Sequence, residues 1–364
     1  MSFSIKKFRL LALLPLLAAG ACSDDPESPM AVDTTTGVYV INNGVQGMHV
    51  PGSVTAIDIE KGSATQQAFL ARNGVQVGDT PQSAFIYGTK MYIAVFDSNI
   101  IWVVDATTLE IKSSIVPPAG TGKPREFTAA AGKVYASLYS GHVACIDTVS
   151  MTVEKTLAVG PNPEQMALTA DGTLYVANSD GDNWMNGNIN SSVSVVDVAA
   201  WKEVEKLQVG LNPTKMATNG TDVFVITMGN YADIPATVKK ITGSVTRDIA
   251  PGTLMAIRDK DLFVINSPVT GGDITYTVYD MEGKVRRSEM VTKPVEYPAA
   301  IAVDSNSGMI FITSYKLGAS GYAEYTEPCY GQLYTEGGMY MGRYELGLNA
   351  VNAVFRTSTT LMPR

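Results

Sequence analysis

Polar side chains follow a proline at four places in the chain, and they have the most potential for chemistry. Each stands directly after its proline or one residue further on, so one repeated backbone geometry should present them in turn. A carboxylate beside a basic group can transfer protons, and amide and guanidinium groups can hold a ligand. The alternative is a solvated rim of alternating charge. The residues are Gln82, Arg125, Glu126, Glu164, Gln165 and Lys215.

Aromatic and amide side chains gather in two long segments between apolar runs, residues 179–192 and 315–330. Aromatic rings with polar edges give a large ligand much contact area at a low cost in conformational entropy. The alternative is that these rings only pack against their own loops. With the shorter segments included, the candidate ligand contacts are Phe96, Tyr139, Asp182, Trp184, Tyr231, Tyr315 and Tyr322.

Histidine is scarce, since His49 and His142 are the only two in the sequence. Zinc-binding and hydrolase motifs that need histidine or paired cysteines do not occur. Residues 179–183 offer oxygen atoms, but their spacing does not place the glycine and distal glutamate where a calcium loop has them. We therefore expect no catalytic residue, no metal ion and no cofactor, and a protein that is not an enzyme.

An imperfect repeat organises the chain from residue 37 to 359. Its clearest element is an apolar strand at 38–42, 91–95, 134–138, 174–178, 223–227, 262–266 and 310–314. A period of 40 to 50 residues is typical of four-stranded propeller blades. The sequence thus predicts an all-β, seven-bladed β-propeller in which a C-terminal strand near 352–357 completes the first blade.

Aspartates recur where the third strand of a blade should end. In a β-turn, an aspartate at this point accepts hydrogen bonds from the next backbone N–H groups, so we interpret the series as turn residues and not as catalytic acids. The series is Asp58, Asp105, Asp147, Asp197 and Asp280. The loops at the other end of each blade would bring the polar and aromatic candidates onto one face.

The first residues resemble a bacterial lipoprotein signal peptide. Basic residues at 6–9 precede an apolar run at 10–17, and small residues lead to Cys22, the expected lipidation site. The acidic stretch 23–27 resembles the export signal of Bacteroidetes surface lipoproteins. We expect a signal peptide at 1–21, a lipidated flexible tether at 22–36, the propeller at 37–359 and a C-terminal tail at 360–364. The lipid would anchor the protein in the outer membrane, with the propeller exposed on the cell surface.

Charge and cysteine content narrow the possibilities further. The formal charge is −8, and it becomes −11 when residues 1–21 are removed, which argues against a nucleic-acid partner. Of the remaining cysteines, Cys145 should pack in a strand and Cys329 should be an unpaired thiol in a loop. We expect no disulfide between them.

Taken with the repeat, two Gly-x-Asn-Pro segments at 160–163 and 210–213 and the stretch 174–197 resemble the YncE-like propellers. Joined to the lipoprotein signal, they resemble the BtuG-type cobalamin-binding lipoproteins of Bacteroidetes. The resemblance implies capture of cobalamin or a related corrinoid and its delivery to a TonB-dependent outer-membrane transporter.

Two other functions stay open at this point. Some similar propellers are lactonase-type enzymes, in which case Arg125, Glu126 and Glu164 would form an acid–base group. A protein-binding or adhesive surface propeller is the third possibility, and an exposed apolar patch on the outer rim would favour it.

Overall fold

The computed structural model describes residues 30–48, 50–181, 187–269 and 271–362. One compact unit, Asp33–Ser358, contains nearly all of the repeat. The expected signal peptide, Cys22, Asp182 and Trp184 lie outside the described residues. No helix in the described ranges has the length and apolar character needed to cross a membrane.

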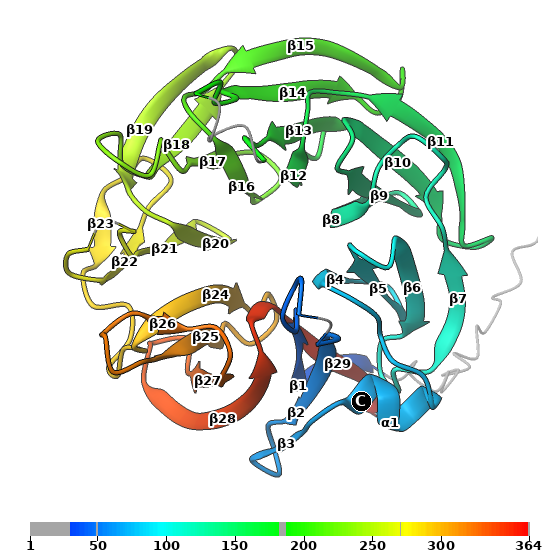
Figure 1. Cartoon of the computed structure of the whole chain (residues 1–364), viewed down its shortest axis with the longest axis vertical. Coiled ribbons are helices and arrows are strands. Elements are labelled where there is room, and N and C mark those ends of the chain that lie inside the picture. The colour runs from blue at the N-terminus through cyan, green and yellow to red at the C-terminus, as the bar shows by residue number, and fades with distance from the viewer. Residues whose placement is uncertain (1–29, 49, 182–186, 270, 363–364) are drawn as a thin grey trace, which may run out of the picture. The chain divides into compact units, whose positions relative to one another are not determined.

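Seven sheets arranged in a ring make up the described part of this unit (Figure 1). We number the sheets as blades 1 to 7 in chain order, each with four main strands. The innermost strands of blades 1 to 7 are β29 (Ala350–Met362), β4 (Pro81–Tyr87), β8 (Pro124–Ala130), β12 (Pro163–Leu168), β16 (Pro213–Thr218), β20 (Leu254–Arg258) and β24 (Tyr297–Val303). These are the strands nearest the centre of the ring.

Further out, the second and third strands carry most of the apolar repeat. The second strands are β1 (Met30–Asn42), β5 (Lys90–Val95), β9 (Lys133–Leu138), β13 (Thr173–Asn178), β17 (Val223–Thr227), β21 (Asp261–Asn266) and β25 (Ile310–Leu317). The third strands are β2 (Ser53–Asp58), β6 (Ile100–Asp105), β10 (His142–Asp147), β14 (Ser192–Asp197), β18 (Thr237–Thr242), β22 (Thr275–Tyr279) and β27 (Pro328–Tyr334).

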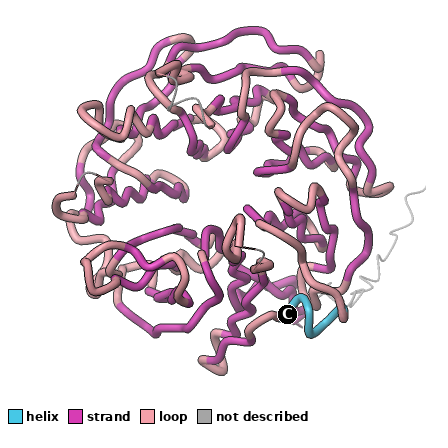
Figure 2. The backbone as a smooth tube through the Cα atoms, viewed as in Figure 1, coloured by secondary structure: helices cyan, strands magenta, loops and turns pink. Residues whose placement is uncertain are grey.

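The outer strands are more polar, and short elements accompany two of the blades. The outer strands are β3 (Ser63–Thr65), β7 (Ile111–Ile115), β11 (Thr152–Ala158), β15 (Lys202–Gln208), β19 (Val245–Pro251), β23 (Val285–Arg287) and β28 (Tyr340–Leu348). Helix α1 (Ala68–Asn73) follows β3, and β26 (Ala323–Glu324) pairs with β25. Strands dominate the ring in Figure 2.

The apolar core lies between blades. One cluster joins Ile41 and Val54 of blade 1 to Met91 and Ile93 of blade 2, and comparable clusters join other neighbouring blades. A middle strand is therefore covered on both faces, which explains why its sequence is continuously apolar and not alternating. The seven-bladed all-β prediction is confirmed.

The repeated aspartates are turn residues, as predicted. Oδ1 of Asp105 accepts the N–H groups of Thr107 and Thr108 at 3.0 and 2.9 Å. Asp147 and Asp197 make the same pair of bonds, and Asp58 and Asp280 make related ones. These carboxylates hold tight turns at the edge of the ring.

The C-terminal strand closes the ring as expected, since β29 joins the sheet of β1, β2 and β3. Blade 7 contacts the start of this strand, because Thr313 of blade 7 donates a hydrogen bond to the Ala350 carbonyl at 2.7 Å. The loop assignment of Cys329 was wrong, because Cys329 is buried within β27. Among the described residues, Cys145 and Cys329 are both free thiols.

Candidate functional site

Loops between the second and third strands of the blades, together with the loops that connect one blade to the next, form one face of the ring, which we call the loop face. Within the described ranges, the inter-strand loops are 43–48 and 50–52, 96–99, 139–141, 179–181 and 187–191, 228–236, 267–269 and 271–274, and 318–327. A side-chain contact joins the first two loops, since Gln46 of the first donates to Asp97 of the second at 3.0 Å.

A bulge opens five of the inner strands on the loop face. In β4, β8, β12, β16 and β24 the first residue is a proline or is followed by one, and the pairing register shifts immediately after it. A β-bulge leaves residues outside the ladder and turns their side chains in a new direction. The bulges contain Gln82, Arg125, Glu126, Glu164 and Gln165, and Lys215 follows the bulge in β16.

Two of these residues form an ion pair between blades. Arg125 contacts Glu164 through Nη2–Oε1 and Nε–Oε2 distances of 2.5 and 3.1 Å. The guanidinium carbon lies 5.2 Å from the ring centre of Phe96 and 4.9 Å from that of Tyr139. These two rings meet edge to face at 5.3 Å. Three neighbouring blades thus meet at Arg125.

Glu126 stands beside this pair and faces the centre of the ring. Burial raises the pKa of its carboxyl group, and the opposing attraction of Lys215 is smaller. Its Oε1 lies 3.5 Å from Nε2 of Gln165. Glu126, Gln165 and Lys215 line a cavity of about 50 Å³ together with the inner strands of blades 6, 7 and 1, which is enough for a few waters or one small polar group.

We call the part of the loop face around Arg125, Glu126, Glu164 and Lys215 the channel mouth. Its positive and negative side chains are equal in number. Arg125 and Lys215 are basic, and Glu126 and Glu164 are acidic, so the four groups carry no net charge when all are ionised. A charged ligand would add an unpaired charge to this partly buried site, which is energetically unfavourable. The arrangement suits a neutral ligand with many hydrogen-bonding groups.

Two asparagines that were not predicted as site residues connect the channel mouth to the loops. Asn162 and Asn212 precede the prolines of β12 and β16 and have left-handed backbone angles, with φ of 47° and 56°. Asn162 Nδ2 donates to the Asp180 carbonyl at 3.1 Å, and Asn212 Oδ1 accepts the Asp180 N–H at 2.9 Å. The repeated Gly-x-Asn-Pro segments were the signal that could have identified them.

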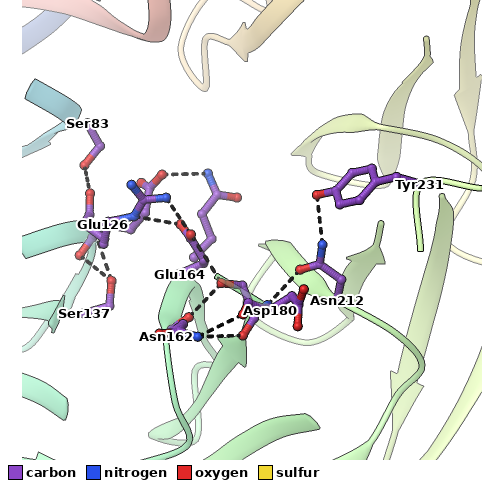
Figure 3. Close-up of polar contacts among 11 residues, drawn as sticks. Ser83, Glu126, Ser137, Asn162, Glu164, Asp180, Asn212 and Tyr231 are labelled. Carbon is purple, nitrogen blue, oxygen red and sulfur yellow. Dashed lines mark hydrogen bonds and ion pairs between the residues drawn. The ribbon is translucent and has the colours of Figure 1, made fainter. Parts of the chain in front are cut away.

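The network extends in both directions from Asp180 (Figure 3). Asn212 Nδ2 donates to the Tyr231 hydroxyl at 2.9 Å, and Ser179 Oγ lies 3.4 Å from Oε1 of Glu164. A continuous line of polar contacts thus runs from the Arg125 pair on blade 3 to Tyr231 on blade 5.

Comparison with protein families assigns residues 36–321 to a domain described as "Domain of unknown function (DUF5074)". The chain belongs to the DUF5074 family. No curated protein sequence matches it.

Solved structures similar to this DUF5074 protein have varied functions. A quinonprotein alcohol dehydrogenase-like protein from Bacteroides thetaiotaomicron is 15% identical over 93% of this chain and 86% of its own, with a TM-score of 0.59. A proposed 6-phosphogluconolactonase from Bacteroides uniformis is 10% identical over 88% of this chain and 100% of its own, with a TM-score of 0.59. The hydrazine synthase of Kuenenia stuttgartiensis is 16% identical over 87% and 99%, with a TM-score of 0.57. At such identities the likeness shows the propeller fold alone.

A second group of candidate residues in the DUF5074 protein lies on blade 7. The Tyr315 ring contacts those of Tyr297 and Tyr325 at 6.2 and 4.8 Å. The placement of Tyr315 in a long loop was wrong, because β25 continues to Leu317 and leaves a loop of residues 318–327 that itself contains β26. Within it, Tyr322 is 74% exposed.

The predicted contacts therefore divide between two places. Phe96, Arg125, Tyr139 and Glu164 meet directly, with Glu126, Gln165 and Lys215 beside them and Tyr231 joined through Asn212, whereas Tyr315 and Tyr322 belong to blade 7. Gln82 holds the equivalent bulge position in β4. In the described ranges, no group of three or more His, Cys, Asp and Glu side chains is placed to hold a metal ion.

Proposed function

We propose that this DUF5074 propeller is a lipid-anchored binding protein of the bacterial outer surface. It captures a nutrient at the loop face and passes it to a TonB-dependent transporter in the outer membrane. The resemblance of residues 1–27 to a lipoprotein signal with an acidic export stretch supports the location. The resemblance to BtuG-type propellers supports cobalamin or a related corrinoid as the ligand.

The arrangement of side chains at the channel mouth is the observation that supports the proposal most directly. Successive bulges place Arg125, Glu126, Glu164 and Gln165 around the channel, with the rings of Phe96 and Tyr139 beside them. Balanced charges, polar side chains and aromatic rings suit a large ligand with many amide groups around an extended apolar ring. A corrinoid has this chemistry. Preformed ion pairs and packed rings also reduce the ordering cost of binding.

Isothermal titration calorimetry of the purified protein with cyanocobalamin tests the proposal. We expect a dissociation constant of about 1 µM or lower, and binding at least about tenfold weaker for Arg125→Ala. Arg286→Ala is the matched control. Arg286 lies on β23, the outer strand of blade 6 and far from the channel, and it pairs with Asp261. If the wild-type protein gives no heat at micromolar concentrations, the corrinoid assignment is wrong.

A lactonase-type hydrolase is the second candidate, and one observation favours it. The raised pKa of Glu126, with Arg125 and Lys215 close by, is the kind of perturbation that a general acid needs. One similar structure is a proposed 6-phosphogluconolactonase. Lactone hydrolysis that falls at least about 100-fold in Glu126→Gln, with the fold retained, would establish this function. No turnover of a panel of sugar lactones would remove it.

A further inference from the structure

An apolar slot opens on the loop face between blades 5 and 6. Its volume is about 90 Å³, and its walls include Met228, Tyr231, Ile234, Pro235, Pro251 and Pro268. Three of these six are prolines, whose rings lose no side-chain freedom when a ligand binds. Of these six residues, only Tyr231 was predicted from the sequence to contact a ligand.

The loop that forms one wall of the slot is fixed by its own hydrogen bonds. Oδ1 of Asn230 accepts the N–H groups of Ala232 and Ile234 at 3.1 and 2.9 Å. Gly229 has φ of 71°, and a β-carbon there would lie 1.8 Å from the Ile234 carbonyl oxygen, so the turn requires glycine. The loop thereby holds the Ile234 side chain open to solvent, with 44% of its surface exposed.

Tyr231 belongs both to the slot and to the polar network. Its ring lines the slot, and its hydroxyl accepts the hydrogen bond from Asn212 (Figure 3). Its φ is 57°, which is unfavourable for an aromatic residue and persists only where surrounding contacts hold it. Such strained residues cluster at ligand clamps. Tyr231 is therefore the wall that joins the slot to the channel mouth.

We propose that the slot receives a flat apolar ring of the same ligand that contacts the channel mouth, so that the ligand is amphipathic. This inference rests on the proposed binding function. An enclosed apolar cavity of about 150 Å³ takes up benzene, so a smaller slot that is open at its mouth admits the edge of one ring.

One polar group in the slot limits the kind of ring that fits. The Thr253 hydroxyl already donates to the Ile265 carbonyl at 3.3 Å and accepts the Ser267 N–H at 3.0 Å. Asn266 also lines the slot, and a side-chain amide there can make one hydrogen bond to a ring that carries a single polar atom.

The first part of the test uses 4-fluorophenol as the probe and fluorine NMR as the readout. We expect a dissociation constant of about 1 mM for the wild-type protein. Ala232→Phe should fill the slot and weaken binding at least tenfold, and Ile234→Ala should weaken it several-fold without disturbing the fold, because Ile234 is half exposed. Ala199→Phe, on an exposed turn at the opposite end of blade 4, is the matched control and should bind as the wild type does. Equal binding by all four proteins, or by none, would show that the slot does not bind an apolar ring.

The second part adds cyanocobalamin and separates this inference from the proposed function. Displacement of the bound probe by cyanocobalamin supports a shared ligand site. If both bind at once without competition, the inference is wrong while the proposed function stands. If the probe binds in the slot and cyanocobalamin does not bind at all, the slot stands and the corrinoid assignment fails.

Discussion

Arg125 and Glu164 lie on neighbouring blades, and their side chains meet in a two-point ion pair at 2.5 and 3.1 Å. Both are largely buried, with 20% and 13% of their side-chain surfaces exposed. The same guanidinium faces Phe96 of blade 2 and Tyr139 of its own blade. One cation therefore links blades 2, 3 and 4 at the loop face, where the apolar core between the blades ends.

Arg125→Ala should lower the free energy of unfolding by about 2 kcal/mol, because it leaves the Glu164 carboxylate without its partner and removes the contacts to two rings. The double variant Arg125→Ala/Glu164→Ala should lose less than the sum of the single variants, with a coupling of about 1 kcal/mol. Urea denaturation of the four proteins measures this. Arg125→Lys should restore only part of the loss, since lysine cannot make the two-point contact. Strictly additive losses would show that the pair contributes nothing of its own.

The raised pKa of Glu126 makes a pH-dependent contribution to stability. A carboxyl whose pKa is higher in the folded state than its ordinary value of 4.5 binds its proton more tightly when folded. Its favourable contribution is complete below that ordinary value and is lost as the pH rises through the folded-state pKa. Glu126→Gln should therefore be more stable than the wild type at about pH 8, and the difference should disappear near about pH 4.

Urea midpoints at both pH values measure this difference. Glu327→Gln is the control, because Glu327 is exposed on the blade 7 loop. A wild-type protein that exceeds Glu126→Gln in stability at about pH 8 would mean that the attraction of Lys215 outweighs burial.

Asn212 has two separable roles, and two substitutions distinguish them. Asn212→Gly keeps the left-handed backbone accessible but removes the bonds to Asp180 and Tyr231, which should cost about 2 kcal/mol. Asn212→Ala should cost about 1 kcal/mol more, because a β-carbon disfavours that conformation. Urea denaturation measures both losses, and faster hydrogen exchange of the Asp180 amide in both variants would report the lost bond. If Asn212→Gly is as stable as the wild type, the side chain does not hold the loops together.

Much of the fold could be predicted because each blade repeats the same local signals. A strand covered on both faces must be continuously apolar, and the turn after the third strand uses an aspartate in five blades. Helix α1 gave no such signal, since it has six residues and no side-chain cap at its N-terminus. Cys329 was misplaced because its segment contains a proline and a glycine. Gly331 in fact serves the strand, since a β-carbon there would lie 2.2 Å from the Phe311 ring.

The candidate site was predictable in its positions but not in its pairings. The proline that precedes Arg125 and Glu164 indicated a shared geometry, and the bulges provide it. Which side chain reaches which depends on the angle between blades, and these two residues are 39 positions apart in the sequence. The role of Asn212 was missed for the same reason, because its partners lie on two different blades.

The Cys329 thiol can report how the ring opens. Cys329 lies in β27 beside the first residue of the closing strand, and its sulfur accepts the Ala350 N–H at 3.4 Å. Burial raises the pKa of this thiol, and the pKa of the buried Cys145 thiol is raised for the same reason. In a Cys22→Ser protein, neither thiol should react with an aromatic disulfide reagent under native conditions, because both lack access and thiolate character.

Low concentrations of urea should make the two thiols differ. The ends of the chain meet in blade 1, where β29 pairs with β1, and this blade packs against Cys329 of blade 7. Local opening there exposes Cys329 without unfolding blade 3, which holds Cys145. Cys329 should therefore be labelled faster than Cys145 below the unfolding midpoint, as measured with the single-cysteine variants Cys145→Ala and Cys329→Ala. Equal labelling rates that rise only at the midpoint would mean that the ring unfolds as one unit. Faster labelling of Cys145 would place the weakest contact between other blades.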